Sequence, residues 1–231
     1  MIHTLRKMLE IIDIKKSYRD HEVLQGISFS VKEGEICGLM GVNGSGKSTL
    51  FKIIANLVLA DSGQVLYNNQ VKKTNDGFGV MIENPAFYPY MTGFQNLYAF
   101  SKLYNNIGKE DINSALKKVG LLNVKQTFGQ YSLGMKQRLY FAFAILANPK
   151  VLLLDEPFSG IDYLSVDILS YLIKDAASRG VSVLISGHQV EQMKDLCHSV
   201  YLLDQGKIVF HAQDIANTDF KQLLLDYTMR E

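Results

Sequence analysis

A glycine-rich segment between residues 41 and 49 has the residue types and the spacing needed to hold phosphate groups. Four residues separate Gly41 from Gly46, and Lys47 and the hydroxyl residue Ser48 follow directly. Backbone N–H groups can surround a phosphate only where side chains do not block its approach, which explains a further glycine, Gly44. The residues expected around the phosphates are Gly41, Val42, Asn43, Gly44, Ser45, Gly46, Lys47, Ser48 and Thr49.

Lys47 and Ser48 predict that the ligand is a magnesium-bound nucleotide. The ammonium of Lys47 supplies a cation to the β- and γ-phosphates, and the hydroxyl of Ser48 can ligate Mg²⁺, which prefers oxygen donors. A helix that begins here adds the partial positive charge of its N-terminus. The alternative is a glycine-rich hairpin, which gives no role to a lysine and a serine at these positions.

A second pair of chemical residues, Asp155 and Glu156, follows the apolar run Val151–Leu154. Adjacent carboxylates at the end of a buried strand are unfavourable unless a cation or a substrate compensates their charge. Beside a phosphate loop, Asp155 is expected to orient magnesium and Glu156 to act as the general base for a hydrolytic water. The alternative is that Asp-Glu-Pro simply ends a strand and begins a loop.

Two kinds of strand and one long helical stretch are expected to position these residues. Ile36–Met40 and Val151–Leu154 are continuous apolar runs, typical of parallel strands covered on both faces. The remaining expected strands are Leu9–Ile14, Val23–Val31, Gln64–Tyr67, Val181–Ile185 and Ser199–Leu203. The expected helices are a stretch at about 84–147, with a capping box at Thr92 and Gln95 and a stop at Gly120, followed by Asp162–Ser178 and Val190–Cys197.

Composition excludes several classes of protein. The chain has 231 residues with 24 basic and 23 acidic side chains, and these are interspersed, so the basic surface of a nucleic-acid-binding protein is missing. The longest apolar run, Leu139–Ala147, is about half the length that a membrane span requires. The cysteines, Cys37 and Cys197, are far apart in the sequence, which favours a reducing compartment.

Three further motifs resemble the ATP-binding subunit of ABC (ATP-binding cassette) transporters. They are Tyr131-Ser-Leu-Gly-Met-Lys-Gln-Arg138, Ser159-Gly-Ile-Asp162 and the segment Ile-Ser-Gly-His188-Gln. The resemblance extends from about Tyr18 to Phe210. It implies an α/β P-loop NTPase fold with a parallel core sheet, an antiparallel β subdomain and a helical insertion, as one domain over 1–231 with the helical subdomain at about 84–147.

The resemblance also implies roles for individual residues. Tyr18 matches the aromatic residue that stacks on adenine, and His188 matches the switch histidine that contacts the γ-phosphate. Ser132 and Gly134 match the signature motif, which contacts ATP held by the opposite subunit. Asp162 matches the loop that links the two sites, so the implied assembly is a head-to-tail dimer of cassettes. ATP and Mg²⁺ are the implied cofactors, and separate polytopic permease subunits are the implied partners at the cytoplasmic face of the membrane.

Departures from the common family pattern narrow the expected subgroup and its cargo. The signature has Leu133 and Met135 where most members have glycine and glutamine, and Glu83 stands where most have a magnesium-sensing glutamine. Glu83 is an expected metal ligand or a solvated loop residue. With the following Asn-Pro-x-Phe-Tyr-Pro, these features resemble the bacitracin-resistance and lantibiotic self-immunity subgroup, which implies a peptide cargo.

The amino-acid sequence leaves open the role of one aromatic cluster and the function of the whole chain. The aromatic cluster of Phe87, Tyr88, Tyr90 and Phe94 either receives a helix of a membrane partner or forms the core of the helical stretch. For the whole chain, the alternatives to an export ATPase are a soluble ABC-type ATPase of DNA repair or translation, a P-loop kinase and a nucleotide-binding regulator without turnover.

Overall fold

The chain folds around a six-stranded sheet with the order β10-β9-β3-β8-β7-β6. The computed structural model describes residues 6–82, 86–104, 107–213 and 215. Strands β3, β8, β7, β6 and β9 run parallel, and β10 is antiparallel to β9. Their bounds are β3 Ile36–Met40, β6 Phe78–Met81, β7 Val151–Leu154, β8 Ser182–Gly187, β9 Ser199–Asp204 and β10 Lys207–Ala212. Every residue of β3 and β7 is buried, as continuous apolar runs predict.

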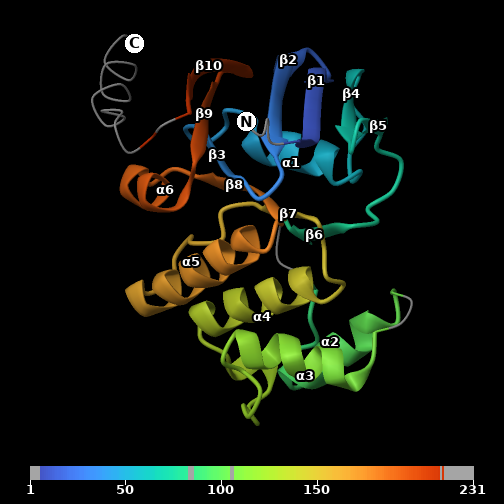
Figure 1. The fold of residues 1–231 in the computed structure, drawn as a ribbon, viewed down its shortest axis with the longest axis vertical. Coiled ribbons are helices and arrows are strands. Elements are labelled where there is room, and N and C mark those ends of the chain that lie inside the picture. The colour runs from blue at the N-terminus through green and yellow to red at the C-terminus, as the bar shows by residue number, and fades with distance from the viewer. Residues whose placement is uncertain (1–5, 83–85, 105–106, 214, 216–231) are drawn as a thin grey trace, which may run out of the picture.

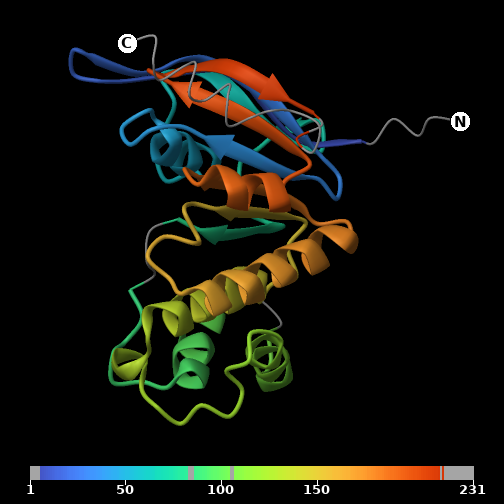
Figure 2. The ribbon, with the colours of Figure 1, turned by 90° about the vertical axis from the view of Figure 1, so that its left-hand side faces the viewer.

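A second, antiparallel sheet has the order β2-β1-β4-β5. It consists of β1 Lys7–Tyr18, β2 His21–Lys32, β4 Ser62–Tyr67 and β5 Gln70–Val71. Helix α1, Lys47–Ile54, lies between the two sheets, and its Leu50, Phe51 and Ile54 are fully buried (Figures 1 and 2). One apolar cluster joins α1 to β1, β2 and the facing side of the parallel strands. The helix that follows the phosphate loop is therefore held from both sides.

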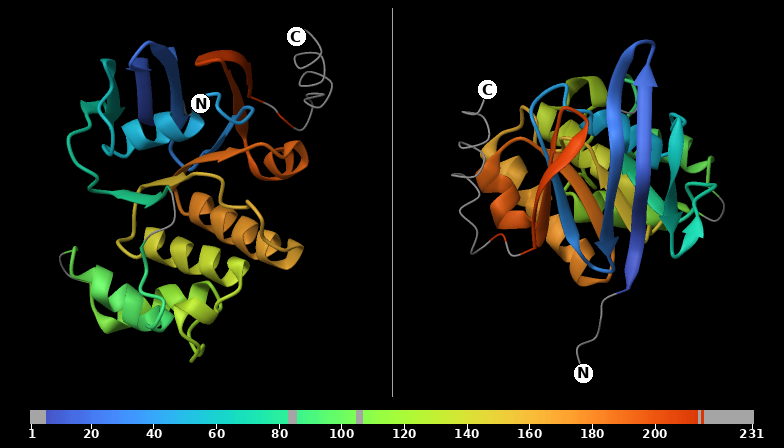
Figure 3. Two further views of the ribbon diagram at one scale, coloured as in Figure 1. Left: turned by 180° about the vertical axis from the view of Figure 1, so that it is seen from behind. Right: turned by 90° about the horizontal axis from the view of Figure 1, so that it is seen from above.

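Helices cover the other face of the parallel sheet. These are α4 Leu133–Ile145, α5 Tyr163–Ser178 and α6 Val190–Leu196, and α2 Gly93–Ser101, α3 Lys109–Lys118 and the 3₁₀ helix η1 Phe128–Gln130 form a further layer below them (Figure 2). Seen from behind, the strand-rich part and the helical layer lie at opposite ends of the molecule (Figure 3, left). The structure confirms the expected α/β fold with a parallel core, an antiparallel sheet and a helical insertion.

Local signals located several helix ends correctly. Thr92 and Gln95 form the expected capping box of α2, and Asp162 caps α5 by accepting from the N–H of Ser165 at 3.0 Å. Strands β5, β6 and β10 had not been predicted. They are short or at a sheet edge, and β6 is a four-residue strand that becomes recognisable only through its pairing with β7.

The aromatic cluster divides between core and surface. Phe87 is buried and packs against the rings of Phe100, Phe128, Tyr140 and Phe143, whereas Tyr88 and Tyr90 are 43% and 69% exposed. Phe94 is partly buried and stacks on Tyr98. The fully buried Asn96 orders this segment: its Oδ1 accepts from the N–H of Tyr88 at 2.7 Å, and its Nδ2 donates to the carbonyls of Tyr88, Met91 and Thr92.

Within the described ranges, no helix combines the length and the apolar character that crossing a membrane requires. Cys37 and Cys197 are both buried and unlinked, and burial raises the pKa of both thiols above the ordinary value. The two thiols are therefore inert at neutral pH.

Candidate functional site

The phosphate loop joins β3 to α1 in a conformation that needs its glycines. Gly44 and Gly46 have φ values of +85° and +109°, which side-chain-bearing residues rarely adopt. A methyl group on Gly41 would collide with the carbonyl of Leu203. Gly46 is the N-cap residue of helix α1 and has no side chain to cap it, so the N–H groups of the first turn are available to an anion. The loop is therefore not a hairpin but a strand-to-helix turn suited to phosphate.

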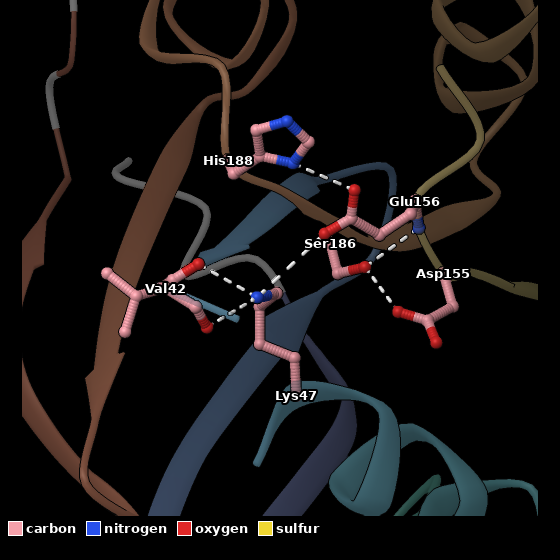
Figure 4. Close-up of polar contacts among 7 residues, drawn as sticks. Val42, Lys47, Asp155, Glu156, Ser186 and His188 are labelled. Atoms are coloured by element: carbon pink, nitrogen blue, oxygen red, sulfur yellow. Dashed lines mark hydrogen bonds and ion pairs between the residues drawn. The ribbon is translucent and has the colours of Figure 1, made fainter. Parts of the chain in front are cut away.

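Lys47 is the cation of this site, and it is only 6% exposed. Its Nζ donates to the carbonyls of Gly41 at 2.8 Å and Val42 at 3.1 Å, and it lies 3.8 Å from Oε1 of Glu156 (Figure 4). Burial lowers the pKa of Lys47, while the charges of Glu156 and Asp155 oppose that shift. The carboxylates that face Lys47 therefore favour its charged form, against the effect of burial.

Asp155 and Glu156 stand at the carboxyl end of β7, and a serine of the neighbouring strand orders both. Ser186 donates from its Oγ to Oδ1 of Asp155 at 2.5 Å and accepts from the N–H of Glu156 at 2.8 Å. Glu156 has a φ of +50°, a left-handed conformation that is uncommon for a residue with a side chain. Ser186 had not been predicted as a site residue, although it lies two residues before His188 in the segment Ile-Ser-Gly-His188-Gln.

His188 completes a line of charged and polar groups. Its Nδ1 lies 2.9 Å from Oε2 of Glu156, whose other oxygen faces Lys47 (Figure 4). The Glu156 carboxylate is thus held between a buried cation and an imidazole. A carboxylate oriented in this way at the edge of a phosphate site can accept a proton from water.

These groups line one pocket of about 430 Å³, a size typical of small-molecule sites. The lining residues are Val23, Asn43, Gly44, Gly46, Lys47, Ser48, Thr49, Glu156, Ser159 and His188. The structure therefore brings the phosphate loop together with Glu156 and His188. Val23 and Ser159 had not been predicted as residues of the site.

The donors near the loop fit a magnesium ion. Ser48 lines the pocket, and Asp155 is close enough to Lys47 to affect its pKa. Both offer oxygen, and Mg²⁺ commonly takes one or two protein ligands, with phosphates and waters completing its shell. Among the described residues, no group of three or more His, Cys, Asp and Glu side chains forms a metal cage. Glu83, the third expected ligand, lies outside the described residues.

The signature residues lie apart from this pocket. Ser132 caps α4 by accepting from the N–H of Met135 at 3.2 Å. Gly134 packs so closely on α5 that an added methyl group would overlap the hydroxyl of Ser165. Ser165 donates twice to Asp162, and these hydrogen bonds lower the pKa of that carboxyl. None of these residues lines the pocket of the phosphate loop.

Tyr18, expected at adenine, also lies outside the lining of this pocket. It ends β1 with 46% of its surface exposed, and Nζ of Lys16 lies 5.3 Å from its ring. The structure therefore leaves its expected role untested.

Comparisons with known proteins agree with the geometry. Residues 24–159 match the family model described as ABC transporter. The chain is 38% identical over 208 residues to the uncharacterized ABC transporter ATP-binding protein YdbJ of Bacillus subtilis, covering 87% of this chain and 68% of that protein. It is 32% identical over 219 residues to the lantibiotic transport ATP-binding protein SrtF of Streptococcus pyogenes, covering 94% and 95%. It is 34% identical over 209 residues to the bacitracin transport ATP-binding protein BcrA of Enterococcus faecalis, covering 87% and 68%.

Solved structures share the fold. A nucleotide-free ATP-binding cassette from an ABC transporter superposes with a TM-score of 0.86 at 22% identity, covering 97% of this chain and 98% of that one. The dimeric cassette MJ0796 superposes with a TM-score of 0.80 at 22% identity, covering 89% and 98%. The family match, the relatives and the phosphate-loop geometry lead to one conclusion: the chain belongs to the ABC transporter family, as a nucleotide-binding subunit that hydrolyses ATP.

Proposed function

We propose that this chain drives export through separate membrane subunits and that its cargo is an antimicrobial peptide. The proposal that the chain hydrolyses ATP with Glu156 as the base rests on one observation. Glu156 lies between Lys47 and His188 in the lining of the phosphate-loop pocket. The narrower cargo assignment is supported by relatives named for lantibiotic and bacitracin transport.

In the proposed reaction, each residue has a separate task. The N–H groups of the loop and the ammonium of Lys47 bind the β- and γ-phosphates. Ser48 and Asp155 would hold Mg²⁺, which neutralises phosphate charge when it is bound. Glu156 accepts the proton of the attacking water, and His188, donating from Nδ1, keeps that carboxylate oriented. Ser186 bonds to both the Asp155 side chain and the Glu156 backbone and thereby fixes their relative positions.

A second cassette would complete the site. Ser132 and Gly134 lie outside the pocket of their own chain, at the start of α4 beside Asp162. In a head-to-tail dimer these residues would approach the γ-phosphate held by the partner, with Asp162 close to the contact between the two sites. The dimeric form of MJ0796, a cassette of the same fold, supports such an assembly.

The membrane partner would dock beside the helical layer, at the cytoplasmic face. Tyr88 and Tyr90 are exposed, with ring centroids 5.8 Å apart, and they follow the buried Phe87 in the chain. Exposed aromatic rings on a well-ordered segment are typical of contact surfaces. Because Asn96 fixes this segment by four hydrogen bonds, its tyrosines are presented in one arrangement. The insertion at about 84–147 would then act as one subdomain between partner and ATP site.

The general-base role of Glu156 can be tested with Glu156→Gln. Since an amide cannot accept the proton of water, steady-state phosphate release should fall by roughly 100- to 10,000-fold. Binding of ATP, measured by calorimetry, should be retained. Glu22→Gln, which changes an exposed carboxylate on β2, should leave phosphate release at the parent rate. Parent-like phosphate release by Glu156→Gln would remove that carboxylate from the mechanism.

The positioning role of Ser186 has a matched control on the same strand. Ser186→Ala removes a donor to Asp155 and an acceptor for the N–H of Glu156, so phosphate release should fall by about two- to tenfold per lost bond. Ser182→Ala removes a buried hydroxyl of β8 that has no hydrogen-bond partner, and its turnover should match the parent. Equal turnover in both variants would contradict the role of Ser186.

The partner surface can be tested by affinity purification from the native membrane. The parent chain should carry polytopic membrane proteins with it, and the double variant Tyr88→Ala, Tyr90→Ala should lose most of them. Leu59→Ala, at a residue that is 83% exposed on another part of the chain, should retain them. Recovery of the same membrane proteins with the double variant would place the contact elsewhere.

The cargo can be tested in cells that produce the chain with its membrane subunits. Such cells should tolerate more of a lantibiotic or bacitracin-type peptide than cells that carry Glu156→Gln, because export requires hydrolysis. The measurement is the minimum inhibitory concentration, with an antibiotic that enters by another route as the control. Equal peptide tolerance in both strains, with hydrolysis active in the parent, would exclude this cargo class.

A further inference from the structure

The segment Leu203–Gly206, which comprises the end of β9 and the turn into β10, lies against the phosphate loop although it is remote in sequence. We propose that this turn is a positioning element: it holds the phosphate loop in its nucleotide-binding shape and ties it to β2. The proposal rests on ATP binding by the loop and adds residues that take no part in the chemistry. Strands β9 and β10 lie beside β3 and β2 when the molecule is viewed from above (Figure 3).

The first group of contacts joins the turn to the loop. The N–H of Gly206 donates to the carbonyl of Ser45 at 3.2 Å. The carbonyl of Leu203 lies so close to Gly41 that no side chain would fit between them. Ser45 is only 3% exposed, so this residue of the loop is covered by protein and not by solvent. One side of the phosphate loop is therefore shaped by the turn.

The second group joins the turn to β2. The N–H of Gln25 donates to the carbonyl of Gly206 at 2.8 Å, and its Nε2 donates to the carbonyl of Gln205 at 3.0 Å, across 180 positions of sequence. A methyl group on Gly206 would lie 2.5 Å from the carbonyl oxygen of Val23. The same oxygen would lie 3.0 Å from a methyl group on Gly46 of the phosphate loop. Val23 itself lines the pocket, so the turn, the loop and β2 contact one another beside that pocket.

The backbone conformation of the turn explains why a glycine stands at position 206. Gly206 has a φ of +75° and Gln205 a φ of +40°, and both are in the left-handed region. Glycine is the residue that adopts this conformation without strain, and at position 206 it also leaves room for β2. Alanine there would combine strain with a collision, and the turn would have to move away from the loop.

A loop that is already in its binding shape does not have to be ordered by the nucleotide, which favours affinity. Loss of the turn contacts should therefore weaken ATP binding and raise the KM for ATP. The turnover of bound ATP should change little, because Glu156 and His188 are placed by β7 and β8. This division between KM and kcat distinguishes a positioning role from general damage.

The test compares Gly206→Ala and Gln25→Ala with the control Gly34→Ala. Gly34 also lies in a turn between two strands, with a φ of +69° and a backbone oxygen 3.2 Å from an added methyl group, but at the opposite end of β3 from the loop. Calorimetric Kd for ATP, KM and kcat should be measured well below the unfolding temperature of each variant. We expect Kd and KM to rise by about two- to tenfold in Gln25→Ala and by about tenfold or more in Gly206→Ala, with parent-like values in Gly34→Ala.

Parent-like Kd and KM in Gly206→Ala, together with a loss of thermal stability equal to that of Gly34→Ala, would overturn the positioning role. A fall in kcat without a change in Kd would do the same. Lys47→Ala separates this outcome from failure of the underlying assignment. If Lys47→Ala binds ATP as the parent does, the phosphate loop is not the ATP site, whatever the turn variants show.

Discussion

The interaction on which the site depends is the charge balance of Lys47. A buried ammonium is stable only where its hydrogen bonds are satisfied and negative charge lies nearby. Here the carbonyls of Gly41 and Val42 accept from it, and Glu156 lies 3.8 Å away. A bound triphosphate would bring further negative charge to the same place. The phosphate loop, the end of β7 and the end of β8 must therefore converge on this one cation.

Parallel strand order is what makes that convergence possible. Because β3, β7 and β8 run in the same direction, their carboxyl ends meet at one edge of the sheet. The loop after β3 supplies Lys47, the residues after β7 supply Asp155 and Glu156, and β8 supplies Ser186 with His188 just beyond. Ligands of open parallel sheets bind outside this edge for the same reason. Helix α1, which follows the loop, packs between the antiparallel sheet and the parallel strands and so anchors the C-terminal end of the loop.

Much of this arrangement could be predicted from local pattern. The apolar runs of β3 and β7, the capping box at Thr92 and the start of a helix at Asp162 each depend on neighbours within a few positions, so sequence alone locates them. Strand β6 escaped prediction because its identity comes from pairing with β7, which is distant in sequence, and β10 because it is a mostly exposed strand at the edge of the sheet. The aromatic cluster was ambiguous for a similar reason: Phe87 and Tyr88 are adjacent, and only packing separates a core ring from an exposed one.

Residue types at short, defined spacings make the phosphate loop, the paired carboxylates and the histidine recognisable in the amino-acid sequence, and these spacings predict their chemistry. The further residues that contact them can be identified only in the folded chain. Ser186 acts on Asp155 and Glu156 across neighbouring strands, and Gly206 acts on Ser45 and β2 from the far end of the chain. Such contacts depend on strand order and on the close approach of backbones, and no spacing along the chain records them.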